Sequence, residues 1–177
     1  MGYRHGRVTS YTADKVTMRG EHPTALSPVT QGVHSCLRVP ADLAVVTFVR
    51  SAIAAVLARE EWPAEGAARM LLASTEAVTN AIEHGSPLGG AVEVALTVTT
   101  DRAQVCVLDE GRPGAPCPVI PDVAPPPTDT RGRGLLIISR LADDVDLRSA
   151  GLGTQISAGF LRATADAVEP EQTRRAA

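Results

Sequence analysis

The sequence predicts an α+β protein in which a sheet and its helices form two layers. Segments with the two-residue period of strands come in adjacent pairs, and segments with a helical period stand apart from them. The order along the chain is strand, helix, helix, strand, strand, long loop, helix, strand, strand. That order excludes a doubly wound parallel sheet, in which single strands alternate with helices.

The first strand and two helices precede the main body of the sheet. Residues 34–40 fit a short edge strand that ends at Pro40, because proline cannot donate to a neighbouring strand. A helix follows from Asp42, a residue type that caps helices. Its apolar stripe contains Val45, Val49, Ile53 and Val56. A second helix begins near Pro63 and stops at Gly85. Its expected buried stripe contains Leu71, Thr75, Val78 and Ile82.

Four strands and one helix complete the chain. Residues 91–99 alternate apolar and polar side chains, as a half-buried strand does. Residues 103–108 are apolar on both faces, which predicts a central strand joined to the previous one by a turn at Thr100 and Asp101. After a loop rich in proline and glycine, residues 135–143 fit a short helix and residues 144–160 a hairpin.

Composition narrows the classes of function. The chain has 177 residues, of which 44% are apolar and only 3% aromatic, and its net charge is −3. One domain of this size can bury a core, but few aromatic residues disfavour a binder of single-stranded nucleic acid, and the negative charge disfavours a duplex binder. The cysteines Cys36, Cys106 and Cys117 form no CxxC pair, so a zinc site is not expected.

The ends of the chain differ in composition from its middle. Residues 1–33 are polar and aperiodic, which predicts a flexible leader, and residues 162–177 predict a flexible tail. The domain is expected at residues 34–161. Neither a membrane-spanning apolar run nor the apolar centre of a signal peptide is present, so we expect a cytoplasmic protein.

Glu76 and Asn80 stand out in the segment STEAVTNAIEHG, residues 74–85. Their spacing of four places both side chains on one face of the second helix, about one turn apart. The amide oxygen of asparagine suits Mg²⁺, and a carboxylate one turn away can act as a general base. Taken alone, the two residues fit a solvated helix face better than a chemical site, so they do not decide the function by themselves.

Three later segments carry residues that suit the binding of a ligand. Asp109 ends an apolar strand, and Gly111 and Gly114 allow a ligand to approach the backbone. The Gly-Arg-Gly at 132–134 precedes an apolar helix, whose first N–H groups attract phosphate. Thr154 opens the last strand and can hydrogen-bond a ligand. An ordinary turn or helix lead-in also explains each segment.

In this order, the four segments resemble the motifs of the GHKL superfamily of ATP-binding domains, to which gyrase, Hsp90, histidine kinases and MutL belong. The matching residues are, in motif order, Glu76 and Asn80; Asp109, Gly111 and Pro113; Gly132, Arg133, Gly134 and Leu135; Gly153 and Thr154. The match covers residues 35–161. Within the superfamily, the segments 74–85, 109–114 and 131–143 are most similar to small bacterial anti-sigma factors with serine kinase activity.

The resemblance implies a fold, cofactors and residue roles. It implies a mixed, mainly antiparallel sheet covered on one face by helices, with ATP and Mg²⁺ as cofactors. Asp109 would contact the adenine amino group, Asn80 would hold Mg²⁺, and Glu76 would activate a serine or threonine hydroxyl of a partner. The other residues implied in ATP binding are Gly111, Pro113, Gly114, Gly132, Arg133, Gly134, Leu135 and Thr154.

The function implied is that of an anti-sigma factor with serine/threonine kinase activity. Such a protein sequesters a sigma factor and phosphorylates an antagonist protein, with no direct nucleic-acid or membrane partner, and relatives commonly form homodimers. Two alternatives remain open at this point. One is a non-catalytic module in which ATP only shapes a protein-binding surface, and the other is an ATPase without a protein substrate.

Overall fold

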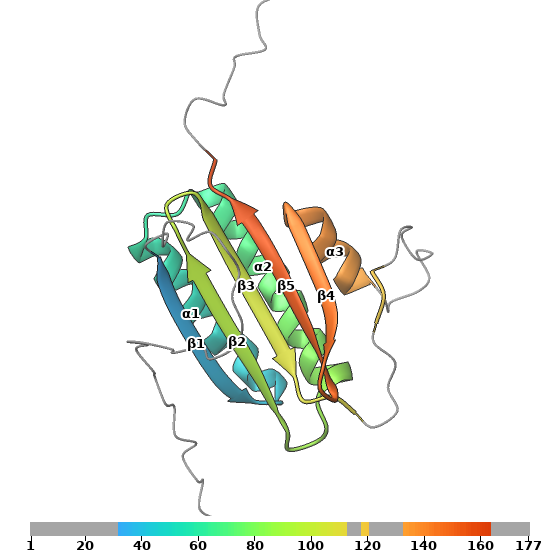
Figure 1. Ribbon diagram of the computed structural model, residues 1–177. Helices are drawn as coiled ribbons and strands as arrows, with labels where there is room; N and C mark the ends of the chain where they lie inside the picture. The colour runs from blue at the N-terminus through green and yellow to red at the C-terminus, as the bar shows by residue number, and fades with distance from the viewer. Residues whose placement is uncertain (1–31, 113–117, 121–132, 164–177) are drawn as a thin grey trace, which may run out of the picture.

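The computed structural model describes residues 32–112, 118–120 and 133–163. Within them, a five-stranded sheet carries helices on one face (Figure 1). This arrangement confirms the α+β two-layer prediction. Most of the expected leader and tail lie outside the described residues, as do the candidate site residues Pro113, Gly114 and Gly132.

The elements follow one another in the order that the sequence predicts. The strands are β1 (Val33–Pro40), β2 (Ala91–Val98), β3 (Arg102–Asp109), β4 (Asp144–Ala150) and β5 (Gly153–Leu161). The helices are η1 (Leu43–Val45), α1 (Val46–Arg59), α2 (Ala64–Asn80), η2 (Ala81–Gly85) and α3 (Arg133–Leu141). Asp42 caps η1 through its side chain, which accepts a hydrogen bond from Ala44 N.

The sheet has the strand order β1-β2-β3-β5-β4. All four neighbouring pairs are antiparallel, so the described strands contain no parallel pair of the kind a mixed sheet would have. Strand β1 lies at an edge and β3 at the centre, as the sequence predicts. The register aligns Val94 with Val107 and Val107 with Ile156, which gives a row of buried apolar side chains across the sheet.

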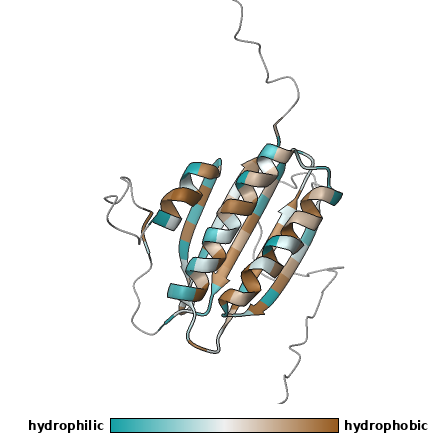
Figure 2. Ribbon diagram, turned by 180° about the vertical axis from the view of Figure 1, so that it is seen from behind, coloured by the Kyte–Doolittle hydropathy of each residue, from teal (hydrophilic) through white to brown (hydrophobic). Residues whose placement is uncertain are grey.

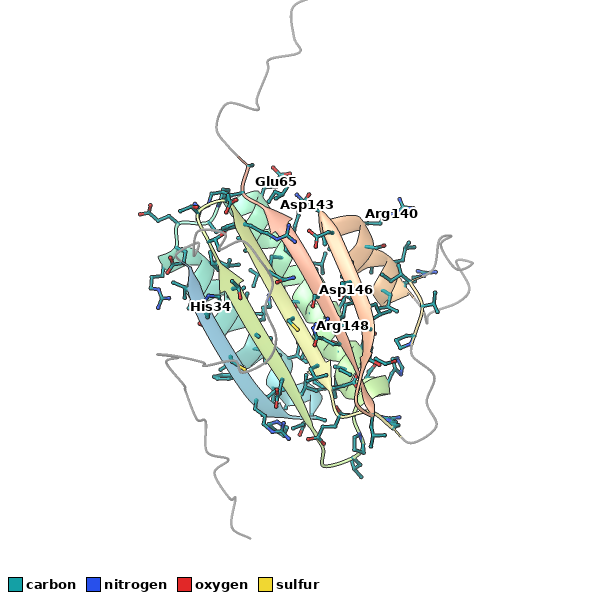
Figure 3. All side chains as sticks on the ribbon, viewed as in Figure 1. His34, Glu65, Arg140, Asp143, Asp146 and Arg148 are labelled. Carbon is teal, nitrogen blue, oxygen red and sulfur yellow. The ribbon has the colours of Figure 1, made fainter. Side chains whose placement is uncertain are left out.

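The core lies between the sheet and the helices. Figure 2 shows α1, α2 and α3 side by side over one face, and α2 lies between the other two. On the opposite face, side chains such as Asp146 and Arg148 of β4 project away from the helices (Figure 3). No helix in the described part of the chain has the length and apolar character needed to cross a bilayer.

The apolar stripe predicted for α2 is only partly right. Val78 and Ile82 are buried, but Leu71 and Thr75 are only partly buried, and the hydroxyl of Thr75 donates to Leu71 O. The residues buried within α2 are Met70, Ala73, Ser74, Ala77 and Val78. Because α2 contacts two helices as well as the sheet, its buried face is wider than one stripe, and small residues allow the close packing.

Helix α1 ends in a left-handed turn at Glu61, whose φ is 51°. The backbone N–H of Trp62 donates to Leu57 O, one of the bonds of a Schellman motif, where glycine is the usual left-handed residue. Arg162, just after β5, donates to the carbonyl oxygens of Glu60 and Glu61 and stacks 4.6 Å from the centre of the Trp62 ring. The end of the last strand therefore holds the end of α1 in place.

Candidate functional site

Helix α2 and the start of α3 form the first part of the site. Glu76 and Asn80 are partly buried on α2. A Cβ atom placed on Gly134 of α3 would lie 2.7 Å from Asn80 Nδ2 and 3.1 Å from Glu76 Oε2. Both side chains therefore pack against the N-terminus of α3 at Gly134, where a larger residue would collide with them. The structure brings together Glu76, Asn80 and Gly134, three residues that the sequence analysis assigns to two separate motifs.

The other end of α3 is fixed to α2 by Arg69. Its Nε donates to Leu141 O at 2.8 Å, and its Nη2 contacts Asp143 Oδ1 at 3.2 Å. The hydrogen bond from Leu161 N holds the pKa of Asp143 below its usual range, and the contact with Arg69 makes a smaller contribution in the same direction. Figure 3 shows Asp143 where α3 passes into β4. Since Gly134 meets Asn80 and Leu141 meets Arg69, α3 runs antiparallel to α2.

The two residues beside Gly134 face different surroundings. Arg133 is exposed at the first position of α3. The side chain of Leu135 is partly buried and packs against the hydrophobic core. Leu135 therefore anchors the helix with its side chain, and only its backbone is available to a ligand at the helix N-terminus.

A second cluster surrounds Asp109 at the end of β3. Asp109 is 7% exposed, and its Oδ1 accepts hydrogen bonds from Gly111 N at 2.8 Å and Thr154 N at 3.0 Å. Gly111 has a φ of 76°, and a Cβ atom there would overlap the carbonyl group of Leu152. Thr154 thus takes part through its backbone N–H, whereas the sequence analysis considered it as a residue that bonds a ligand.

Gly85 belongs to the Asp109 cluster, although the sequence indicates it only as the residue at which the helix ends. The helix does end at Gly85, but Gly85 is not among the glycines with a left-handed φ. A Cβ atom at Gly85 would instead overlap Oδ2 of Asp109. The absence of a side chain is needed so that the carboxylate can approach the helix end. Its position on the same helix as Asn80 is the signal that could have indicated this role.

Helix α2 continues through η2 and so joins the two clusters. In η2 the backbone widens into a π turn, in which Ser86 N donates to Ala81 O at 2.7 Å. π turns inside helices are frequent at functional sites. Gly85 follows Asn80 by five residues along this continuous helix, so the two clusters lie at different levels of it. The clusters therefore suit a ligand with a ring at one end and phosphates at the other.

Arg112 is a further residue of the site that the sequence analysis missed. It follows the Asp109 cluster, and its Nε donates to Ser86 O at 2.9 Å while its Nη2 donates to Glu83 O at 2.8 Å. Both carbonyl groups belong to the end of the helix formed by α2 and η2. No sequence signal indicated this contact, because a single arginine in a loop has no period. The side chains of Glu83 and His84 are exposed.

The donor set at Asn80 fits a metal ion that is held mainly by its nucleotide. Within the described ranges, no group of three or more His, Cys, Asp or Glu side chains could hold a metal ion unaided. Mg²⁺ commonly keeps several waters and takes one or two protein ligands together with phosphate oxygens. Asn80, which packs against Gly134 at the N-terminus of α3, carries an amide oxygen that could serve as one such protein ligand.

Comparison with known proteins identifies the fold family. The model of the histidine kinase-like ATPase domain family matches residues 39–160. The chain belongs to this family. This membership confirms the GHKL resemblance, and it implies ATP as the ligand of a histidine kinase-like ATPase domain.

A solved structure shares the fold of this chain. The crystal structure of the RsbU and RsbW domains of Rv1364c from Mycobacterium tuberculosis is similar to this histidine kinase-like ATPase domain, with 20% sequence identity and a TM-score of 0.55. The match covers 75% of this chain and 33% of that one, so the chain spans about a third of its relative. At this identity the likeness shows the fold. No curated protein matches the chain in sequence.

Proposed function

We propose that the chain is an ATP-dependent serine/threonine protein kinase that acts as an anti-sigma factor. It binds ATP with Mg²⁺ across the two clusters, phosphorylates an antagonist protein and sequesters a sigma factor. One observation carries the proposed chemistry. A carboxylate (Glu76), a metal-ligand amide (Asn80) and the N-terminus of α3 at Gly134 converge on one spot.

The Asp109 cluster is suited to recognise adenine. Two backbone N–H groups already occupy Oδ1, so Oδ2 is the oxygen that can accept a further hydrogen bond. An ionised carboxylate accepts hydrogen bonds and donates none. Adenine presents an amino group as a donor at its six position, whereas guanine presents a carbonyl oxygen there, which the carboxylate would repel. We therefore expect the site to prefer ATP over GTP.

The Asn80 cluster is suited to the phosphates and to the transfer step. N–H groups in the first turn of a helix attract phosphate, and the exposed Arg133 at the start of α3 adds a positive charge. Asn80 would hold Mg²⁺, which neutralises phosphate charge when bound. Glu76 lies beside the same spot, so its carboxylate can take the proton of a hydroxyl that attacks the γ-phosphate. Phosphoryl transfer needs mainly such positioning and charge neutralisation.

The identity of the partners rests on the resemblance of residues 74–85, 109–114 and 131–143 to anti-sigma factor kinases. The shared fold with a chain that contains an RsbW domain supports the same choice. The hydroxyl to be phosphorylated therefore belongs, in this proposal, to a serine or threonine of a small antagonist protein.

A label-transfer assay tests the kinase proposal. The purified protein is incubated with γ-labelled ATP, Mg²⁺ and the candidate antagonist, and label on the antagonist is measured over time. Glu76→Gln should still bind ATP, but it should transfer label at least about a hundredfold more slowly than the wild-type protein. The matched control is Glu83→Gln, because Glu83 is an exposed glutamate at the end of the same helix. It should transfer label at the wild-type rate.

Each other outcome of this assay selects a different function. If Glu76→Gln transfers label at the wild-type rate, Glu76 does not activate the attacking hydroxyl. ATP binding without label transfer, together with unchanged sigma-factor binding by Glu76→Gln, would identify a non-catalytic binding module. Release of free phosphate in the absence of any partner would identify an ATPase without a protein substrate.

A further inference from the structure

The segment after β3 is fixed to the sheet at three consecutive residues. Asp109 accepts from Thr154 N, and Glu110 pairs with Arg38 of β1 at 2.5 Å. Gly111 rests against the carbonyl group of Leu152 in the turn between β4 and β5. These contacts hold the Asp109 cluster in place relative to the strands. Its own contact with the helix that carries Asn80 is the packing of the Asp109 carboxylate against Gly85.

The next residue, Arg112, fixes the same segment to that helix. Its guanidinium group donates to Ser86 O and Glu83 O at 2.9 Å and 2.8 Å. Carbonyl groups at a helix C-terminus lack helical partners and carry partial negative charge, so they bind a cation well. Arg112 lies three residues after Asp109 in the chain, and Glu83 lies three residues after Asn80. Arg112 thus adds two hydrogen bonds to the packing contact by which Gly85 already joins the two clusters.

We propose that Arg112 is a positioning residue that sets the distance between the base half and the phosphate half of the nucleotide site. The proposal rests on the ATP binding proposed above. Arg112 acts through main-chain carbonyl groups, so the nucleotide gains no direct contact from it. Its contribution is pre-organisation, because a nucleotide that must order the two halves on binding loses part of its affinity in doing so.

If Arg112 has this positioning role, its removal should affect the binding of two ligands differently, whereas loss of a purely structural residue should weaken the binding of both. Adenosine reaches only the base half, whereas ATP with Mg²⁺ must engage both halves at once. The hydrogen bonds from Gly111 N and Thr154 N to Asp109 do not depend on Arg112, so the base half should survive its removal. Loss of Arg112 should therefore weaken ATP·Mg²⁺ binding and leave adenosine binding unchanged.

Equilibrium dialysis with radiolabelled adenosine and with radiolabelled ATP·Mg²⁺ tests the proposal on the full chain. For Arg112→Ala we expect a dissociation constant for ATP·Mg²⁺ raised about tenfold, with that for adenosine unchanged. Arg112→Lys should recover part of the loss, because its ammonium group can still donate to the carbonyl groups. The control is Arg59→Ala, since Arg59 is an exposed arginine at the end of α1, far from the site in the chain and in the fold.

The outcomes separate this inference from the function on which it rests. Equal loss of affinity for both ligands would overturn it, because Arg112 would then merely support Asp109. Unchanged ATP affinity in Arg112→Ala would overturn it as well. If the wild-type protein binds neither ligand, the proposed function itself fails. Should Arg112→Ala not fold, Arg112→Lys still decides, since the proposal requires it to lower ATP affinity without lowering adenosine affinity.

Discussion

Replacing Gly134 by alanine introduces one methyl group where α3 meets α2. That carbon would lie 2.7 Å from Asn80 Nδ2 and 3.1 Å from Glu76 Oε2, whereas ordinary contacts begin at 3.4 Å. Either α3 or the amide of Asn80 must therefore move by about 0.7 Å to restore van der Waals contact. The atoms that move are those that we expect to hold Mg²⁺ and the γ-phosphate.

Two opposing effects set the stability of Gly134→Ala. Alanine favours a helix over glycine by about 1 kcal/mol. The displacement of two side-chain ends costs a similar amount, about 1 kcal/mol, so the free energy of unfolding should change little. Function should change more, because a misplacement near 1 Å costs about a hundredfold in the rate of a positioned reaction.

Urea unfolding and the label-transfer assay together measure both quantities. The matched control is Ser139→Ala, which also increases helix propensity in α3 but removes only a hydrogen bond from Ser139 Oγ to Leu136 O. It should keep the wild-type transfer rate. If Gly134→Ala also transfers phosphoryl groups at the wild-type rate, α3 does not approach the phosphates, and the reasoning about this spot is wrong.

Three further substitutions test other parts of the structure. Glu61→Gly should raise the free energy of unfolding by about 0.5 kcal/mol, because the left-handed turn costs glutamate more than the extra chain entropy costs glycine; a lower value in urea unfolding would contradict the turn assigned there. Asp143→Asn should lower stability at neutral pH by about 1 kcal/mol. The hydrogen bond from Leu161 N and the contact with Arg69 lower the pKa of Asp143 in the folded state, so this stabilisation is present above about pH 4 and disappears as the pH falls further. A wild-type-to-variant difference that stays constant between pH 7 and acid would refute this origin. Gly111→Ala should lower the free energy of unfolding by about 2 kcal/mol or more and should abolish ATP binding. Gly151→Ala, with φ 65° but open space around its Cβ, should lower the free energy of unfolding by only about 1 kcal/mol. Equal decreases would show that backbone strain alone matters.

The elements were predictable because their patterns are local. Alternation in β2 and the apolar β3 indicated their places, and Pro40 indicated an edge strand. The insertion of β5 between β3 and β4 was not predictable, because either strand of the last hairpin could have paired with β3. The buried face of α2 is wider than the predicted stripe because α2 packs against α1, α3 and the sheet, and the periodicity within α2 does not show which elements pack against it.

The candidate site was predictable as a set of motifs and not as a geometry. The order of Glu76, Asn80, Asp109 and the glycines along the chain led to the correct family. The sequence could not show that Gly134 faces Asn80 or that Gly85 faces Asp109, because these are contacts between different elements. The sequence also could not show the hydrogen bonds of Arg112. Its partners are main-chain carbonyl groups, which every type of residue has, so the residue types at these positions do not indicate the contact.

Titration calorimetry with ATP tests most directly whether one nucleotide spans both clusters. The wild-type protein, Asp109→Asn and Asn80→Ala are each titrated with and without Mg²⁺. We expect the wild type to bind one ATP about tenfold more tightly with Mg²⁺ than without it. Asp109→Asn should bind weakly in both conditions, and Asn80→Ala should lose only the effect of Mg²⁺. Wild-type affinity in Asp109→Asn, or a full Mg²⁺ effect in Asn80→Ala, would contradict the account.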